Sequence, residues 1–336
     1  MMIKNFMLYN PHSNTDVTSY YVNLIGECLK EMAYDVKEIN KLDRNVNNRE
    51  TGIVVVDLKD SIEAKKCGYG YIIYWIQGVA PEEAFLKKND LLRYFLYSYR
   101  ECKALNAANF VFYCSNTMKQ HYEKKYHYKL DGYYVMPCFN EEIKPIKIKN
   151  KEYSDNIFVY AGSLEKWQNF ENTVKFYKDV EKRIDNAVFK VFVKDRDRAE
   201  KILKEHSVKH FCIDYVTSEK LSDEIDKAKF GFCLRKNITV NKVATPTKLS
   251  NYVANGVMPI YSKCLNGFYE KAKNSSFCFN GDDPDVLERI INACERHIKG
   301  VDVLKDYKEC FGEYYSSEYH KKEICRVLKN ILKGKE

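Results

Sequence analysis

The sequence of 336 residues lacks the patterns that mark several common protein classes. No run approaches the roughly 20 apolar residues needed to span a bilayer, and no small-residue cleavage site follows the short apolar start. The 12 cysteines form no C-x-x-C pair, and the seven histidines show no H-E-x-x-H spacing, which disfavours zinc sites. G-x-S-x-G and Walker A patterns are also absent, so serine hydrolases and P-loop NTPases have no sequence support.

The charge is moderately basic, with a formal net charge of +8. This excess suits phosphate-bearing ligands or an anionic membrane surface. Lysines and arginines are scattered among 47 acidic residues, without a zinc-finger spacing or a continuous basic helix, so a nucleic-acid partner is not expected. Cysteines spread singly through apolar runs are typical of a reduced, cytoplasmic protein. Any membrane contact is therefore expected to be peripheral, at the inner face of the plasma membrane.

Short apolar runs alternate with amphipathic helical stretches, which is typical of parallel sheets covered on both faces. The first series of runs is Ile3–Tyr9, Asp35–Ile39, Ile53–Leu58, Tyr71–Ile76, Phe110–Cys114 and Tyr133–Met136. The second series is Ile157–Gly162, Val188–Val193, His210–Val216, Phe230–Arg235, Val257–Ser262 and Ser276–Phe279. We therefore predict an α/β protein of two Rossmann-like domains that face each other across a cleft.

The domain boundary is expected in the polar stretch Asn140–Asp155, which carries Pro145 and interrupts the alternation. The predicted domains are residues 1–145 and 146–315, and an apolar stripe predicts a terminal helix in 316–336. Ligands of open α/β sheets bind outside the carboxyl ends of the strands. The loops after the strands are therefore the candidate sites.

The most informative loop follows a buried strand that ends at Arg235 and leads to a helix that opens at Thr245-Pro246-Thr247-Lys248. Thr245 or Thr247 can cap this helix, and Pro246 suits its first turn. The exposed N–H groups there form an anion site, to which Arg235 and Lys248 add positive charge. Such a set would hold a diphosphate, but an ordinary capped helix with a solvated lysine explains the same residues equally well.

A second candidate loop follows the first strand of the second half. Gly162 and Ser163 allow a backbone to approach a phosphate closely, as first strand-to-helix turns do in nucleotide-binding sheets. Lys166 lies three residues further on. Trp167 is expected to pack between this loop and the next helix, because tryptophan is usually largely buried.

The first of these loops resembles the donor-site motif of bacterial glycosyltransferases of the GT-B fold, in particular family 4 and its capsule and exopolysaccharide relatives. That motif runs approximately Arg, loop, Asn-x-x-Ala-Ser-Pro-x-Lys, then Glu-Tyr-x-Ala-x-Gly-x-Pro-Ile. The residues that match in order and spacing are Arg235, Asn241, Ala244, Thr245, Pro246, Lys248, Tyr252, Ala254, Gly256, Pro259 and Ile260. Asn251 stands where the family usually has a glutamate on the ribose hydroxyls, and Val243 where a second acidic residue often lies. The stretch Tyr160–Gln168 looks like the family's loop that faces the diphosphate and sugar.

The first half has weaker candidates. Gln77 and Gly78 end an apolar strand and are placed to contact sugar or acceptor hydroxyls. His12 lies in the loop where family 4 enzymes carry a glycine loop near the reacting sugar. The stretch from Glu101 to Ser115 is similar to an E-x-x-x-x-x-A-D-x-V-x-x-x-S pattern of the same fold, and Ser115 is expected at a helix N-cap.

The resemblance implies an enzyme that moves a sugar from a UDP- or GDP-sugar to a hydroxyl of a saccharide or lipid-linked acceptor, in bacterial surface polysaccharide assembly. It implies retention of anomeric configuration, no required metal or other cofactor, and a C-terminal helix that crosses back to the first domain. Arg235 and Lys248 would neutralise the diphosphate. The rest of the donor site would be formed by Gly162, Ser163, Lys166, Thr245, Pro246, Thr247 and Asn251.

Two other classes of protein fit parts of this pattern. Asn251 and Val243 in place of acidic residues are compatible with a sugar-nucleotide-binding or regulatory protein that does not turn over. Donor hydrolysis or transfer would separate this alternative from an enzyme. A two-domain periplasmic-type binding protein is disfavoured, because no export signal is found and the cysteines are unpaired.

Overall fold

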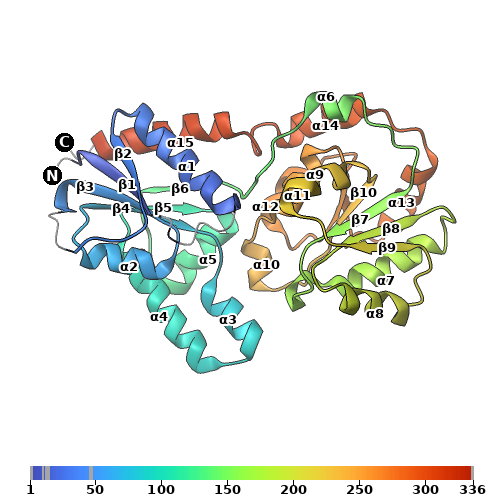
Figure 1. Ribbon diagram of the computed structural model, residues 1–336, viewed down its shortest axis with the longest axis horizontal. Helices are drawn as coiled ribbons and strands as arrows, with labels where there is room; N and C mark the ends of the chain where they lie inside the picture. The colour runs from blue at the N-terminus through green and yellow to red at the C-terminus, as the bar shows by residue number, and fades with distance from the viewer. Residues whose placement is uncertain (1–2, 10, 12–15, 45–47, 334–336) are drawn as a thin grey trace. The chain divides into compact units, whose positions relative to one another are not determined.

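The computed structural model describes residues 3–9, 11, 16–44 and 48–333. The chain divides into two compact units (Figure 1). The first extends to Pro137 and resumes at Ser316, and the second is Cys138–Tyr315. Each unit is built on a six-stranded sheet in which every described pairing is parallel.

The first unit has the strand order β2-β1-β3-β4-β5-β6. Its strands are β1 (Asn5–Tyr9), β2 (Asp35–Ile39), β3 (Thr51–Val55), β4 (Tyr71–Ile76), β5 (Phe110–Tyr113) and β6 (Tyr133–Val135). Its helices are α1 (Asp16–Glu31), η1 (Asn48–Glu50), α2 (Leu58–Lys66), α3 (Ala80–Lys88), α4 (Leu91–Ala107) and α5 (Asn116–Tyr126). The central strands β3, β4 and β5 are buried at every position, which explains why they read as continuous apolar runs rather than as alternating ones.

The second unit has the order β12-β11-β10-β7-β8-β9. Its strands are β7 (Ile157–Ala161), β8 (Val188–Phe192), β9 (Phe211–Asp214), β10 (Phe230–Cys233), β11 (Met258–Tyr261) and β12 (Phe279–Asn280). Its helices are α6 (Pro145–Lys149), η2 (Lys166–Gln168), α7 (Phe170–Glu181), α8 (Arg196–Glu205), α9 (Ser218–Asp226), α10 (Thr239–Val243), α11 (Thr247–Ala254), α12 (Asn266–Ala272), α13 (Val286–Glu295) and α14 (Gly300–Phe311). The predicted α/β class with two Rossmann-like domains is confirmed.

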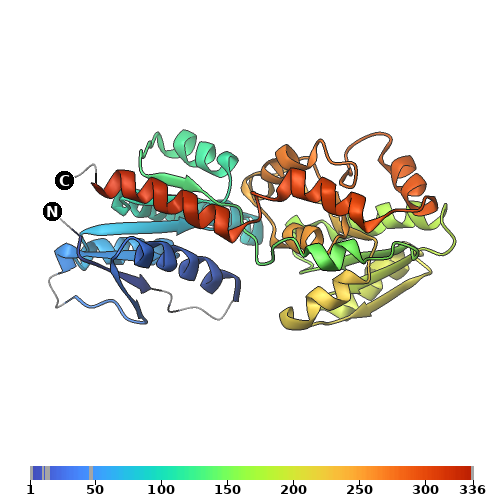
Figure 2. The same ribbon diagram turned by 90° about the horizontal axis from the view of Figure 1, so that it is seen from above.

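The C-terminal helix α15 (Ser317–Lys333) belongs to the first unit, as the resemblance implied. It lies along α1, and the two helices are side by side in both ribbon views (Figures 1 and 2). The Cys325 thiol donates to the Cys28 carbonyl at 3.6 Å, and Lys321 pairs with Glu27 and Glu31. The apolar stripe of α15 is therefore buried against α1. This contact holds the first and last helices of the chain in the same unit.

The stretch predicted as a linker, Asn140–Asp155, lies inside the second unit, which begins at Cys138. It contains α6, and its Ile148 and Tyr153 side chains are buried. The Tyr153 hydroxyl donates to the Gly256 carbonyl at 2.7 Å. The polar composition of this stretch indicated a linker. In the structure the stretch instead packs on the second unit and forms hydrogen bonds with its surface.

Helix α11 packs on the second sheet through the ring of Tyr252. A β-carbon added to Gly231 of β10 would lie 2.7 Å from ring atoms of Tyr252. The Tyr252 hydroxyl donates to the Phe232 carbonyl at 3.2 Å, so the ring cannot move away without losing a buried hydrogen bond. The glycine therefore lets α11 approach the strand closely.

We expect Gly231→Ala to lower the free energy of unfolding by about 1–3 kcal/mol, because the added methyl group overpacks this contact. Urea unfolding of the full chain measures the loss. In a Tyr252→Leu background the same methyl group should cost much less, since the ring is gone. Equal costs in the two backgrounds would show that the ring does not require the glycine.

Candidate functional site

The carboxyl ends of β7 and β10 lie side by side at the point where the second sheet reverses its strand order. The two strands pair directly, with Phe230 opposite Phe158. The chain continues from β7 to β8 on one side and from β10 to β11 on the other. In open α/β sheets ligands bind outside such a switch point. Gly162 follows β7 there, and Arg235 follows β10.

Lys248, in the first turn of α11, reaches this point. A β-carbon added to Gly162 would lie 3.0 Å from its Nζ atom, and the Gly162 φ of +152° is one that L side chains rarely adopt. The ammonium lies over the Tyr160 ring, 3.8 Å from the centroid, a cation–π contact. The glycine predicted from the sequence therefore provides the space that the lysine head occupies.

Arg235 and Lys248 bring two positive charges together without an acidic partner. Within the described residues neither side chain forms an ion pair, and Lys248 Nζ and Arg235 Nε are buried without a hydrogen-bond partner. Burial, followed by the positive charge of Arg235, lowers the pKa of Lys248 to about 7. Buried charges in proteins are normally paired, because an unpaired one is costly. Arg235 and Lys248, which have no such partner, are therefore suited to bind an anion.

The start of α11 adds to this field, but not as the sequence suggested. Pro246 occupies the N-cap position and no side chain caps the helix, so the prediction that Thr245 or Thr247 caps it is wrong. The Thr245 hydroxyl instead accepts from the Cys138 N–H at 2.8 Å, and Thr247 is the first helical residue. Uncapped N–H groups at the positive end of a helix favour negative charge.

Near Lys248, two neutral side chains also have a buried polar atom without a hydrogen-bond partner. Asn251 lies three residues after Lys248, on the same face of α11, and its Oδ1 atom is buried and unpaired. Gln168 Oε1 is likewise unpaired and would lie 3.9 Å from a β-carbon on Gly162. The sequence contained Gln168 only within a longer matched stretch. A glutamine in a polar turn carries no local signal, and the fold alone brings it beside Gly162.

The remaining residues comprise Asn241, which only matches the family motif, and two predicted donor-site residues, Ser163 and Lys166. Asn241 donates to the Trp167 carbonyl at 3.0 Å and to the Lys236 carbonyl at 2.8 Å, which ties the η2 turn to the loop after β10. Ser163 is exposed, and its carbonyl accepts from the Tyr160 hydroxyl at 2.6 Å. Lys166 is exposed on η2. Contact of the Ser163 and Lys166 side chains with a ligand stays a prediction.

In the first unit, Gln77 and Gly78 follow β4 as expected. Gln77 donates to the Thr18 hydroxyl at 3.4 Å, and the Gly78 carbonyl accepts from the Tyr122 hydroxyl at 2.9 Å. Ser115 caps α5 by accepting from the Met118 N–H at 3.0 Å, which confirms its predicted N-cap. His12 lies outside the described residues. That Gln77 and Gly78 contact a sugar or acceptor stays a prediction.

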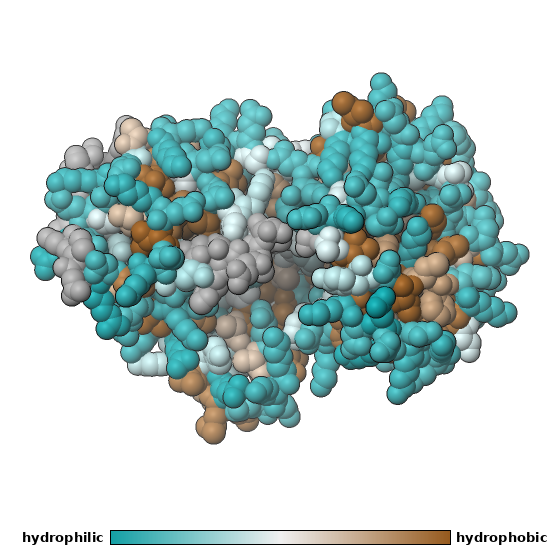
Figure 3. Space-filling model, viewed as in Figure 1, coloured by the Kyte–Doolittle hydropathy of each residue, from teal (hydrophilic) through white to brown (hydrophobic). Residues whose placement is uncertain are grey.

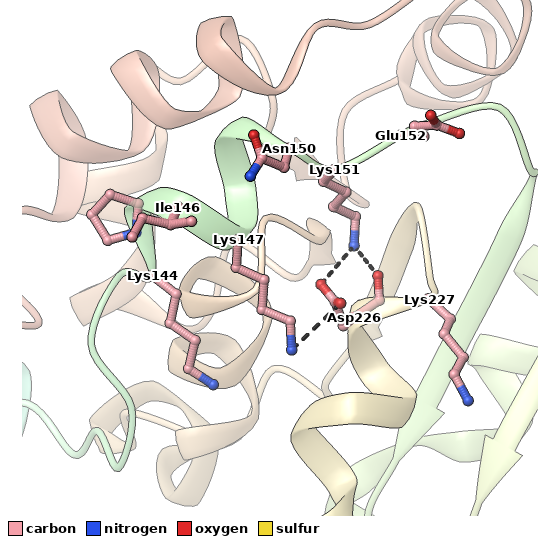
Figure 4. A pocket seen from close by; sticks show the side chains of 9 residues that line it. Lys144, Ile146, Lys147, Asn150, Lys151, Glu152, Asp226 and Lys227 are labelled. Atoms are coloured by element: carbon pink, nitrogen blue, oxygen red, sulfur yellow. Dashed lines mark hydrogen bonds and ion pairs between the residues drawn. The ribbon is translucent and has the colours of Figure 1, made fainter.

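A pocket of about 690 Å³ lies between α6 and the end of α9 (Figure 4). Lysines line it, but they have acidic partners. Lys147 and Lys151 lie 3.4 Å and 3.7 Å from the carboxylate of Asp226, and Lys144 lies 3.0 Å from Glu141. Because these charges are compensated, this pocket attracts an anion less than Arg235 and Lys248 do.

Within the described ranges, no group of three or more His, Cys, Asp or Glu side chains is placed to hold a metal ion. Among the helices described, none is both long and apolar enough to cross a membrane. Metal independence stays a prediction.

No protein-family model and no curated protein matches the sequence. Solved structures do match in fold. Sucrose-phosphate synthase from Thermosynechococcus elongatus has a TM-score of 0.70 at 11% identity, covering 98% of this chain and 100% of that one. A mutant of S. aureus TarM in complex with fondaparinux, alpha-GlcNAc-glycerol and UDP has a TM-score of 0.61 at 10% identity, covering 85% of this chain and 56% of that one.

A third structure, named as trehalose-6-phosphate from E. coli bound with UDP-2-fluoro glucose, has a TM-score of 0.61 at 10% identity and covers 94% of this chain and 78% of that one. Of these structures, TarM is much longer than this chain, which spans 56% of its length. At such identities the likeness concerns the fold, and it confirms the GT-B fold that the resemblance implied. Membership of family 4 stays a prediction.

We expect Lys248→Met, an apolar side chain of similar length, to stabilise the protein. The folded-state pKa of about 7 lies below the value of about 10.4 for an unfolded lysine, so between these pH values the unfolded chain binds one more proton. The stability of the wild type therefore rises with pH in this window, and the full penalty applies below pH 7. The gain from Lys248→Met should be largest below pH 7 and fall by about 1.4 kcal/mol per pH unit above it.

Urea unfolding on both sides of pH 7 measures this difference. The matched control is Lys242→Met on α10, which replaces an exposed lysine and should give no pH-dependent gain. A gain for Lys248→Met that is the same at every pH would mean that the Lys248 amine is solvated in the folded protein.

Proposed function

We propose that the protein is a glycosyltransferase that binds a nucleoside-diphosphate sugar at the carboxyl ends of β7 and β10. The observation that carries this proposal is the buried pair of Arg235 and Lys248, which lacks an acidic partner and adjoins the uncapped start of α11. A diphosphate supplies the negative charge that this pair lacks. The sugar is transferred to a hydroxyl of a saccharide or lipid-linked acceptor.

The chemistry follows from the placement of these charges. Transfer breaks the bond between the anomeric carbon and the diphosphate oxygen and forms a bond from that carbon to the acceptor oxygen, whose proton passes to the leaving phosphate. Negative charge develops on the leaving nucleoside diphosphate. Arg235, Lys248 and the N–H groups of α11 are fixed before the reaction and stabilise that charge. Because a nearby anion favours the protonated amine, diphosphate binding raises the pKa of Lys248 from its value of about 7 in the free protein.

The donor is a UDP- or GDP-sugar, and two similar folds favour UDP. The TarM structure contains UDP, and the E. coli structure contains UDP-2-fluoro glucose. Asn251 is proposed to bond a hydroxyl of the nucleoside, since a buried amide can both donate and accept. Gln168, beside Gly162, is proposed to bond the phosphate or the sugar. Retention of configuration, metal independence and a role in surface polysaccharide assembly rest on the sequence resemblance.

We expect Arg235→Ala and Lys248→Ala each to lower the affinity for UDP by about tenfold to a hundredfold, because each removes a charge-assisted contact worth about 1.5–3 kcal/mol. Isothermal titration calorimetry measures the affinity, and circular dichroism shows that the fold is kept. Lys242→Ala, at an exposed lysine nearby in sequence, is the control and should bind as the wild type does. Unchanged affinity in both variants would place the diphosphate elsewhere.

We expect the wild type to release UDP or GDP from a nucleotide-sugar, faster when an acceptor hydroxyl is present. A coupled assay for nucleotide release, over a set of donors and saccharide or lipid-linked acceptors, measures this turnover. Arg235→Ala should lower kcat, since the lost charge acts on the leaving group. NMR of the anomeric proton shows whether configuration is retained, and an inverted product would refute retention.

If nucleotide release stays at background while UDP or GDP still binds, the enzyme proposal fails. The protein would then be the non-catalytic sugar-nucleotide-binding protein considered from the sequence. The binding and turnover measurements therefore test the site and the activity separately.

A further inference from the structure

Helix α4 exposes a row of large apolar side chains. Leu92 is 84% exposed and Phe95 is 65% exposed, and Leu91, Leu96 and Tyr99 are exposed as well. In Figure 1 the α3–α4 pair projects from the first sheet, and Figure 3 shows hydrophobic residues gathered at its projecting end. Large exposed apolar patches mark interaction surfaces, whereas single exposed apolar residues do not.

The row lies on one face of the helix. At about 100° per residue, Leu91, Leu92, Phe95, Leu96 and Tyr99 fall within an arc of about 140°. The opposite face is held by the protein: Ala104 and Leu105 are buried, and the Ala104 carbonyl accepts from the Ser61 hydroxyl of α2 at 2.9 Å. The apolar face of α4 is therefore exposed to solvent, while contacts on the opposite face hold the helix in place.

Basic residues flank this face. Arg100 and Lys103 lie in the next turns of α4, and Lys88 ends α3. The Lys103 ammonium lies 4.5 Å from the centroid of the Tyr99 ring, so its stem follows the apolar row while its charge stays in water. The flank of the apolar face is therefore positively charged.

The acidic groups of the α3–α4 pair have partners of their own. Glu83 accepts from the Val79 N–H at the start of α3, at 3.3 Å. Glu101 is only 1% exposed and accepts from the Tyr122 hydroxyl at 2.6 Å. Glu82 pairs with Lys125 of α5 at 2.8 Å. Asp90 caps α4 and pairs with Arg93 at 3.2 Å.

We propose that this face, made of Leu91, Leu92, Phe95, Leu96 and Tyr99 with Arg100 and Lys103 beside them, docks on an anionic lipid bilayer. The interfacial region of a bilayer accepts a helix that lies in its plane with apolar residues inward and lysine or arginine at the headgroups. Tyrosine suits the same depth, because its ring is apolar and its hydroxyl is wet. The inference does not depend on the transferase reaction.

Co-sedimentation of the full chain with vesicles tests this surface. The wild type should bind vesicles of phosphatidylcholine and phosphatidylglycerol more tightly than vesicles of phosphatidylcholine alone, and salt should weaken that binding. Leu92→Ser with Phe95→Ser should lower the affinity by at least about tenfold. Arg100→Gln with Lys103→Gln should lower it by about tenfold on the anionic vesicles alone.

The matched control is Ile146→Ser, which removes an aliphatic side chain that is 80% exposed on α6 and should leave vesicle binding unchanged. Circular dichroism and thermal unfolding check that the variants fold, as expected for substitutions at exposed positions. Wild-type binding that shows no preference for anionic vesicles, or that survives the Leu92 and Phe95 changes, overturns the proposal. A wild-type dimer in light scattering that Leu92→Ser with Phe95→Ser converts to a monomer, without vesicle binding, would assign the face to a second copy instead.

Discussion

The candidate site of the second unit is organised around one constraint, the burial of the Lys248 ammonium beside Arg235 without an acidic partner. Burial removes the hydration of the Lys248 ammonium, and the positive charge of Arg235 adds repulsion, which is why the pKa of Lys248 falls to about 7. The two charges stay together because the surrounding structure holds them. Gly162 leaves space for the lysine head, and the Tyr160 ring lies beneath it.

Helix α11, which carries Lys248, is held from two sides. Below, the Tyr252 ring fills the space left by Gly231 of β10. Above, the stretch that follows β6 binds the helix at both ends, through the Cys138 N–H on Thr245 and the Lys144 N–H on the Ala254 carbonyl at 3.1 Å. These contacts compensate for an N-terminus that no side chain caps, so the protein keeps a locally unfavourable arrangement that favours anion binding.

The two units differ in the kind of ligand that their candidate binding surfaces suit. The second concentrates unpaired positive charge at the switch point of its sheet, which suits a small, highly charged ligand. The first presents an extended apolar face on α4 with basic residues beside it, which suits a broad surface. The Glu101 network explains how that helix is fixed, since the Tyr122 and Tyr126 hydroxyls both donate to this buried carboxylate.

The sequence by itself determined the strands, the α/β class, and Arg235 and Lys248 as the charged pair, because apolar periodicity and residue order are local properties. Ser115 was likewise readable as a helix start, and it caps α5. Only the tertiary structure decided that Thr245 bonds Cys138 rather than capping α11, that Gln168 reaches Gly162, and that Asn140–Asp155 packs instead of linking. It also decided which face of α4 remains uncovered. These outcomes depend on which distant segments of the chain come into contact. A hydrogen bond or a buried face needs two partners, and the local sequence contains only one of them.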